Sequence, residues 1–149
     1  MPINRHKKGK TGELEFSLAL QALLGLRLDR RLCQTREGGL DFVQAGFPFC
    51  VEVRRREKLQ VDKWWDETIE KAQEATKNAA TGAPGNTPTP YPALAFRINR
   101  KPWTVRIPIA SLAEAYEGQS LWMAIDTTIE VFAMVCRELL ARQYLSEKL

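Results

Sequence analysis

Three stretches of the chain carry apolar residues at helical spacing. Their apolar positions recur every three or four residues, so that one face of each helix would be apolar. Gly25 ends the first stretch, as glycine commonly does at the C-terminus of a helix. The pattern predicts helices over residues 11–24, 60–80 and 127–144, and a short helix beginning at Ser111.

Shorter stretches alternate apolar and polar residues or are continuously apolar, as is typical of strands. A turn at residues 34–39 and a turn containing Gly46 separate the first three of them. Residues 81–92 are expected to form a loop, because three of the last five residues are proline. The pattern predicts strands over residues 27–33, 40–45, 49–54, 93–98 and 103–107, and a brief strand near 122–125.

The resulting order is αβββαββ with trailing elements, which predicts an α/β domain with a mixed central sheet flanked by helices. A chain of 149 residues with 44% hydrophobic residues is enough for one core. We expect a basic flexible arm over residues 1–10 and a single domain over 11–149. No long apolar run or apolar leader is present, so neither a membrane partner nor secretion is expected, and a cytoplasmic protein is the default.

Cysteine and histidine are too sparse to carry the chemistry. The three cysteines are an odd number without C-x-x-C spacing, so we expect buried thiols and no zinc site. A single histidine, His6, argues against histidine-based triads. Any reaction must therefore use carboxylates, Lys, Arg and hydroxyl groups.

Basic residues gather in three clusters, although the net charge is only +4. Such clusters attract a phosphate backbone through counterion release, whereas any one of them could be a solvated surface. Three clusters around a set of carboxylates favour nucleic acid as the partner. The clusters are Arg5, Lys7, Lys8 and Lys10; Arg54, Arg55, Arg56 and Lys58; and Arg97, Arg100, Lys101 and Arg106.

Two carboxylates are placed by the first predicted hairpin. Glu52 and Arg54 project from one face of their strand, and Val51 and Val53 project from the other. The hairpin brings Asp41 close to Glu52, and a hard cation such as Mg²⁺ needs clustered oxygen ligands of this kind. A metal held there would activate water for phosphodiester hydrolysis. The alternative roles are a turn residue for Asp41 and an ion pair with Arg54 for Glu52.

Glu13 is the third candidate carboxylate. It shares a helical stripe with Phe16 and Leu20, which is the side expected to face the core. The alternative is that Glu13 and Glu15 complement the positive end of the helix dipole, and Glu15 fits that role better.

The order of these motifs resembles that of the Hjc-type Holliday junction resolvases of archaea and phages, within the PD-(D/E)xK nuclease superfamily. The resemblance covers most of residues 8–115. It rests on Lys8-Gly9 with Glu13, on Gly39-Leu40-Asp41, on Val51-Glu52-Val53-Arg54, and on the second hairpin, Leu94-Ala95-Phe96-Arg97 with Trp103-Thr104-Val105-Arg106-Ile107-Pro108.

The resemblance implies a restriction-endonuclease-like core in which Glu13, Asp41 and Glu52 bind Mg²⁺, with Mn²⁺ able to substitute and no organic cofactor. It also implies a homodimer that nicks opposing strands of a four-way DNA junction symmetrically. The family has a polar residue before the Asp, a position that Gln34, Thr35 or Arg36 would fill. We expect DNA contacts from these three residues and from Arg5, Lys7, Lys8, Lys10, Arg55, Arg56 and Lys58.

One residue departs from the family pattern, because Arg54 stands where the family has a catalytic lysine. Arginine stabilises negative charge but stays protonated, so it cannot act as a base. Either Arg54 serves as an electrostatic stabiliser, which its strand face favours, or Lys58 supplies the lysine. Alternatively, cutting is slowed or lost. The remaining alternatives are a nuclease of linear duplex DNA and a non-catalytic branched-DNA-binding protein of the same fold.

Overall fold

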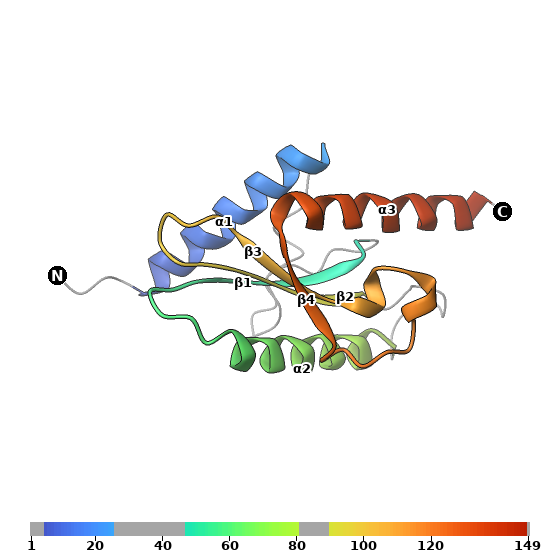
Figure 1. Cartoon of the computed structure of the whole chain (residues 1–149), viewed down its shortest axis with the longest axis horizontal. Coiled ribbons are helices and arrows are strands. Elements are labelled where there is room, and N and C mark those ends of the chain that lie inside the picture. The colour runs from blue at the N-terminus through green and yellow to red at the C-terminus, as the bar shows by residue number, and fades with distance from the viewer. Residues whose placement is uncertain (1–4, 26–46, 81–89, 149) are drawn as a thin grey trace.

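The computed structural model describes residues 5–25, 47–80 and 90–148, without the side chains of 5–10 and 75–80. Its helices pack around one four-stranded sheet (Figure 1). The elements are α1 (Arg5–Leu24), β1 (Phe49–Arg55), α2 (Val61–Ala80), β2 (Tyr91–Arg97), β3 (Thr104–Pro108), the 3₁₀ turns η2 (Ile109–Ser111) and η3 (Glu114–Tyr116), β4 (Ala124–Thr128) and α3 (Ile129–Lys148).

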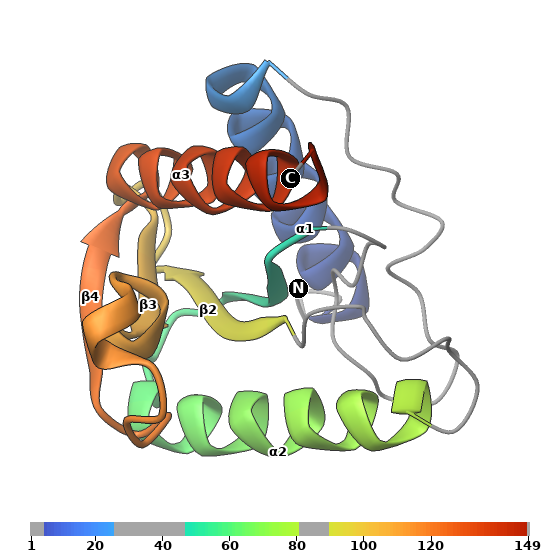
Figure 2. The same cartoon turned by 90° about the vertical axis from the view of Figure 1, so that its right-hand side faces the viewer.

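The sheet is mixed, with strand order β1-β2-β3-β4. β1 and β2 are parallel and α2 forms the crossover between them, whereas β2, β3 and β4 are antiparallel neighbours. Helices α1 and α3 cover one face and α2 covers the other (Figures 1 and 2). This three-layer arrangement confirms the predicted α/β class with a mixed sheet flanked by helices.

Alternation along β1 divides its side chains between the two faces. Phe49, Val51 and Val53 enter the main core beneath α1 and α3. Cys50 packs against Ala72 of α2, so it lies on the other face. Since side chains of a strand alternate, Glu52 and Arg54 share the α2 face with Cys50, as the sequence predicted.

The main core is centred on three aromatic rings contributed by α1, β1 and α3. Phe16, Phe49 and Phe132 are all fully buried. The ring centroids of Phe49 and Phe132 are 4.9 Å apart, and those of Phe16 and Phe132 are 6.4 Å apart. Phe132 therefore joins the C-terminal helix to both α1 and the sheet.

A second core fills the space between α2 and the sheet. It contains both Trp64 and Trp65, with exposed fractions of 8% and 3%, together with Leu94 and Phe96. Adjacent residues of a helix point about 100° apart, so the two indoles cannot both face the sheet directly. Leu121 and Ala124 pack against the same cluster, so the second indole is covered from the side of β4.

Several predicted boundaries are corrected by the structure. Helix α1 begins at Arg5 instead of Thr11, so residues 5–10 of the expected arm are helical. Only Gly9 in that stretch is a poor helix former, and no proline interrupts it. The helix expected from Ser111 is replaced by two 3₁₀ turns, and β4 begins two residues later than the predicted strand.

Strand β2 begins at Tyr91, so Tyr91 and Pro92 belong to the sheet and not to the preceding loop. Pro92 is tolerated because β3 pairs with β2 only at Leu94–Phe96, leaving its nitrogen outside that ladder. The predicted strands 27–33 and 40–45, the turn at 34–39 and most of the loop 81–92 lie outside the described residues.

Cys50 and Cys136 are buried free thiols, as expected. Burial raises the pKa of Cys50 to about 12 and raises that of Cys136 as well, so both stay protonated near neutral pH. Cys33 lies outside the described residues. Among the helices that the structure describes, none is both long and apolar enough to cross a membrane.

Candidate active site

Strand β1 carries a buried carboxylate on its α2 face. Glu52 is only 3% exposed. Its Oε1 atom lies 2.8 Å from Nη2 of Arg54 and 3.3 Å from Nζ of Lys71. Desolvating a carboxylate is costly unless cations and hydrogen bonds compensate, and here two cations from different elements do so.

Two side chains from the flank of α2 join this pair: Lys71 contacts the carboxylate of Glu52, and Glu67 contacts Arg54. The neighbouring residues Thr68 and Ala72 are buried against the sheet, which fixes the helix position. Glu67 Oε2 lies 3.6 Å from Arg54 Nη2. We call Glu52, Arg54, Glu67 and Lys71 the Glu52 cluster. It combines two negative and two positive side chains, and it is therefore neutral as a group.

Apolar side chains of β2 lie beside the Glu52 cluster. In the parallel register Glu52 is aligned with Leu94, and Arg54 is aligned with Phe96. Leu94 is fully buried and Phe96 is 6% exposed. Charges interact more strongly in such a partly dehydrated setting than in water. The cationic side chains of the cluster would therefore attract a phosphate, and its carboxylates a metal ion, more strongly than they would in water.

Of the other predicted acids, the structure describes Glu13 and not Asp41. β1 ends the described strand order, and the predicted partner strand 40–45 with Asp41 lies outside the described residues, as do Gln34, Thr35 and Arg36. Glu13 is half-buried on α1, which covers the opposite face of the sheet from α2, so the structure does not bring it beside Glu52 as the sequence predicted. Within the described part of the chain, no three Asp, Glu, His or Cys side chains form a group able to hold a metal.

The carboxylate of Glu52 is nevertheless a suitable ligand for a hard divalent cation. Glu52 offers a carboxylate oxygen, the ligand that Mg²⁺ and Mn²⁺ prefer. Arg54 and Lys71 both contact its Oε1 atom and offset part of the cost of burying a charge there. Glu52 thus fits one position of a metal site.

Glu15 does not serve the helix dipole, which corrects the role we expected for it. Since α1 begins at Arg5, Glu15 lies about three turns into the helix. Its Oε1 atom accepts a hydrogen bond from Nη1 of Arg55 at 3.0 Å, and its Oε2 atom accepts one from Arg97. The Arg97 guanidinium also lies 4.8 Å from the centre of the Trp103 ring. Glu15 therefore ties α1 to the ends of β1 and β2.

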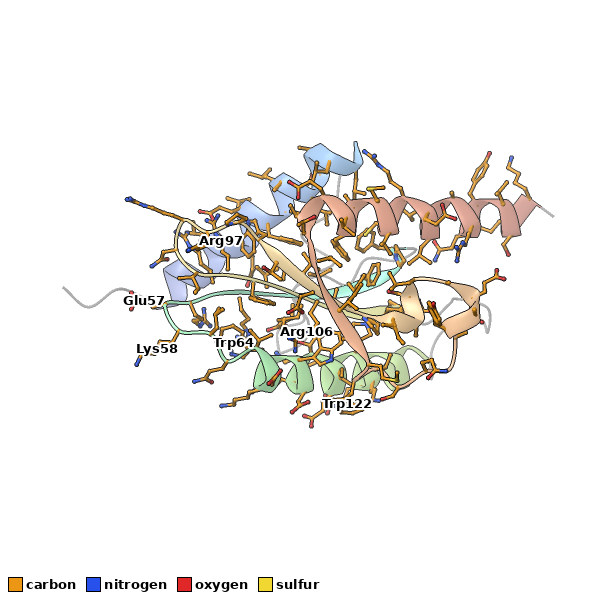
Figure 3. All side chains as sticks on the ribbon, in the orientation of Figure 1. Glu57, Lys58, Trp64, Arg97, Arg106 and Trp122 are labelled. Carbon is orange, nitrogen blue, oxygen red and sulfur yellow. The ribbon has the colours of Figure 1, made fainter. Side chains whose placement is uncertain are left out.

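The basic clusters converge where α1 begins, β1 ends and β2 turns into β3 (Figure 1). Arg55 and Arg97 are aligned in the sheet, and a Cβ atom placed on Gly12 would lie 3.1 Å from that of Arg55. Figure 3 shows Lys58 at this end, with its side chain directed away from the sheet. We call this region the basic end; its sequence contains Arg5, Lys7, Lys8, Lys10, Arg55, Arg56, Lys58, Arg97, Arg100 and Lys101.

Arg106 belongs to a different part of the molecule from the rest of its sequence cluster. It donates hydrogen bonds to Asp126 from Nε at 2.6 Å and to Asp62 from Nη1 at 3.1 Å. These contacts join β3 to β4 and α2, so Arg106 has a structural role that the charge pattern did not reveal. The hydrogen bond to Asp126 is the main cause that raises the pKa of Arg106.

Sequence reasoning missed Lys71 and Glu67. The only signal was their spacing of four residues on a predicted helix, with the acid before the base. That spacing is common in exposed helices, where the two side chains pair with each other. Here they pair instead with two residues of a strand.

Comparison with known proteins gives one match. The family model described as "Phage putative PDDEXK endonuclease" matches residues 4–141, a range that includes α1, the whole sheet and the Glu52 cluster. No curated protein and no solved structure gives a significant match.

Proposed function

Because the chain belongs to the phage PDDEXK endonuclease family, we propose that it is a Mg²⁺-dependent DNA endonuclease that resolves four-way junctions by paired symmetric nicks. The observation that carries this proposal is the buried Glu52, whose carboxylate is held between Arg54 and Lys71. An acid placed so deeply among apolar strands is typical of a functional site.

In this proposal Glu52 and Asp41 hold the divalent ion, whereas Glu13 belongs to α1, on the opposite face of the sheet from Glu52, and is not assigned to it. The ion would polarise the scissile phosphate and lower the pKa of an attacking water. Arg54 lies beside Glu52, where its guanidinium would stabilise the negative charge that develops on the phosphate. Glu67 holds the guanidinium group of Arg54 from α2.

The basic end supplies the phosphate contacts that bring DNA to the Glu52 cluster. Contacts to the backbone read the shape of a branched molecule and not its base sequence. A homodimer would present two such surfaces and two active sites, and its two-fold axis would match the pseudo-symmetry of a four-way junction.

The proposal is tested by incubating the purified protein with Mg²⁺ or Mn²⁺ and three synthetic DNAs: a four-way junction, a flap and a linear duplex. We expect symmetric nicks on the junction alone. Cutting of the linear duplex would instead identify a general duplex nuclease of this family. Junction binding without any product would identify a non-catalytic DNA-binding protein.

Replacing Arg54 by Lys should retain or raise the cleavage rate. The shorter lysine side chain keeps a positive charge beside Glu52. It also restores the residue type found at this position in the Hjc-type resolvases that the sequence resembles. The measurement is the single-turnover cleavage rate of a labelled junction. A large loss of rate would show that the planar guanidinium itself is required at this position.

Replacing Lys58 by Gln should weaken junction binding without slowing the chemical step. Lys58 is exposed at the basic end, and losing one phosphate contact lowers the slope of log affinity against log salt by about 1. Binding is measured by fluorescence anisotropy at several salt concentrations in Ca²⁺.

Lys148→Gln is the matched control for Lys58→Gln, since Lys148 lies at the opposite end of the molecule (Figure 1). We expect its salt slope to equal that of the wild type. If Lys58→Gln reduced the rate at saturating protein, Lys58 and not Arg54 would be the residue that replaces the missing lysine.

A further inference from the structure

The Glu52 cluster contains an ammonium group that the strand motif lacks. Lys71 Nζ lies 3.3 Å from Glu52 Oε1, the same oxygen atom that Arg54 Nη2 contacts at 2.8 Å. Lys71 comes from α2, 19 residues beyond Glu52. A lysine thus reaches the carboxylate of the Glu-x-Arg sequence from the neighbouring layer of the fold.

The local packing fixes the backbone from which Lys71 projects. Ala72 is 3% exposed and packs against Cys50, two residues before Glu52 on β1. A small side chain at this point lets the helix approach the strand closely. The side chain of Lys71 is 25% exposed, so it borders both the buried carboxylate and the solvent from which DNA arrives.

Arginine and lysine differ in what they can do beside a reacting phosphate. The planar guanidinium of Arg54 is held between Glu52 and Glu67. An ammonium is a compact charge with three donors on a flexible stem, so it can exchange a carboxylate for a water molecule or a phosphate oxygen. Of the two cations in the cluster, Lys71 is the one suited to orienting the attacking water.

We propose that Lys71 of α2 takes the role of the lysine that the strand motif lacks, leaving Arg54 as the fixed electrostatic partner. This inference rests on the proposed nuclease function. It also replaces Lys58 as the source of the lysine, because Lys58 is exposed three residues beyond the end of β1 and points away from the sheet (Figure 3).

The decisive experiment combines two substitutions. Lys71→Met should reduce the single-turnover cleavage of a Mg²⁺-bound junction by at least about a hundredfold. The double variant Lys71→Met with Arg54→Lys should cut at least about tenfold faster than Lys71→Met alone, since it returns an ammonium to the same carboxylate. Lys63→Met, an exposed lysine on the same helix, should cut at the wild-type rate.

A measurement without DNA tests the placement of Lys71 independently of activity. Removing a positive charge beside a metal-binding carboxylate should tighten Mn²⁺ binding by roughly three- to tenfold in Lys71→Met, as measured by isothermal titration calorimetry. Lys63→Met should not change it. Unchanged Mn²⁺ affinity in Lys71→Met would overturn the inference.

The outcomes separate this inference from the proposed function. If the wild type cuts DNA and Lys71→Met cuts equally well, the inference is wrong and the nuclease stands. If Lys71→Met loses activity that Arg54→Lys does not recover, Lys71 only supports the structure, which also overturns the inference. If the wild type cuts no DNA in Mg²⁺ or Mn²⁺, both proposals fail together.

Discussion

Glu52→Gln should abolish DNA cleavage, with a loss of at least roughly 10³-fold in the single-turnover rate. The substitution keeps the size of the side chain and removes the charge that a divalent ion requires. Junction binding in Ca²⁺ should stay close to the wild-type value, because neutralising an acid does not weaken phosphate contacts. Asp41→Asn should behave in the same way.

Glu130→Gln is the control for these variants, since Glu130 is an exposed acid on α3, on the other side of the sheet. Its cleavage rate should equal that of the wild type. Glu52→Gln should also remain folded, because Arg54 and Lys71 are 21% and 25% exposed and can turn towards water. Unchanged cleavage in both Glu52→Gln and Asp41→Asn would refute the active-site assignment.

Phe132→Ala should cause a large loss of stability. The ring is fully buried between Phe16 and Phe49, and its removal leaves a cavity that three separate elements cannot all collapse to fill. We expect a cost of about 3–5 kcal/mol in the free energy of unfolding and a fall of roughly 6–20 °C in the thermal midpoint. Urea and thermal denaturation followed by circular dichroism measure the two quantities.

Met134→Ala provides a matched comparison on the same helix, because Met134 is 65% exposed. Its effect on stability should stay within about 0.5 kcal/mol. If both substitutions cost the same, α3 would not be anchored to the core through Phe132.

The sequence predicted the part of the site that depends on local structure. Alternation along residues 49–54 correctly placed Glu52 and Arg54 on one face, because a strand has the same periodicity whatever surrounds it. The helix over residues 60–80 was also predicted within one residue of its start. Both features follow from short-range patterns.

The contact between Glu52 and Lys71 could not be predicted, because it depends on how α2 rests on β1. Helical spacing alone pairs Lys71 with Glu67, whereas the packing of α2 on β1, with Ala72 against Cys50, places Lys71 beside Glu52. Glu15 was misread for a related reason. Placing the helix start at Thr11 put Glu15 in the first turn, whereas the observed start at Arg5 puts it beside Arg55 and Arg97.

The strand-helix-strand crossover has a consequence for how the protein folds. All four members of the Glu52 cluster come from β1 and α2, and its longest link spans only 19 residues. Closing so short a loop costs little chain entropy, and contacts of low sequence separation form quickly. The charged cluster is therefore available to assemble early, before the distant C-terminal helix docks onto the opposite face of the sheet.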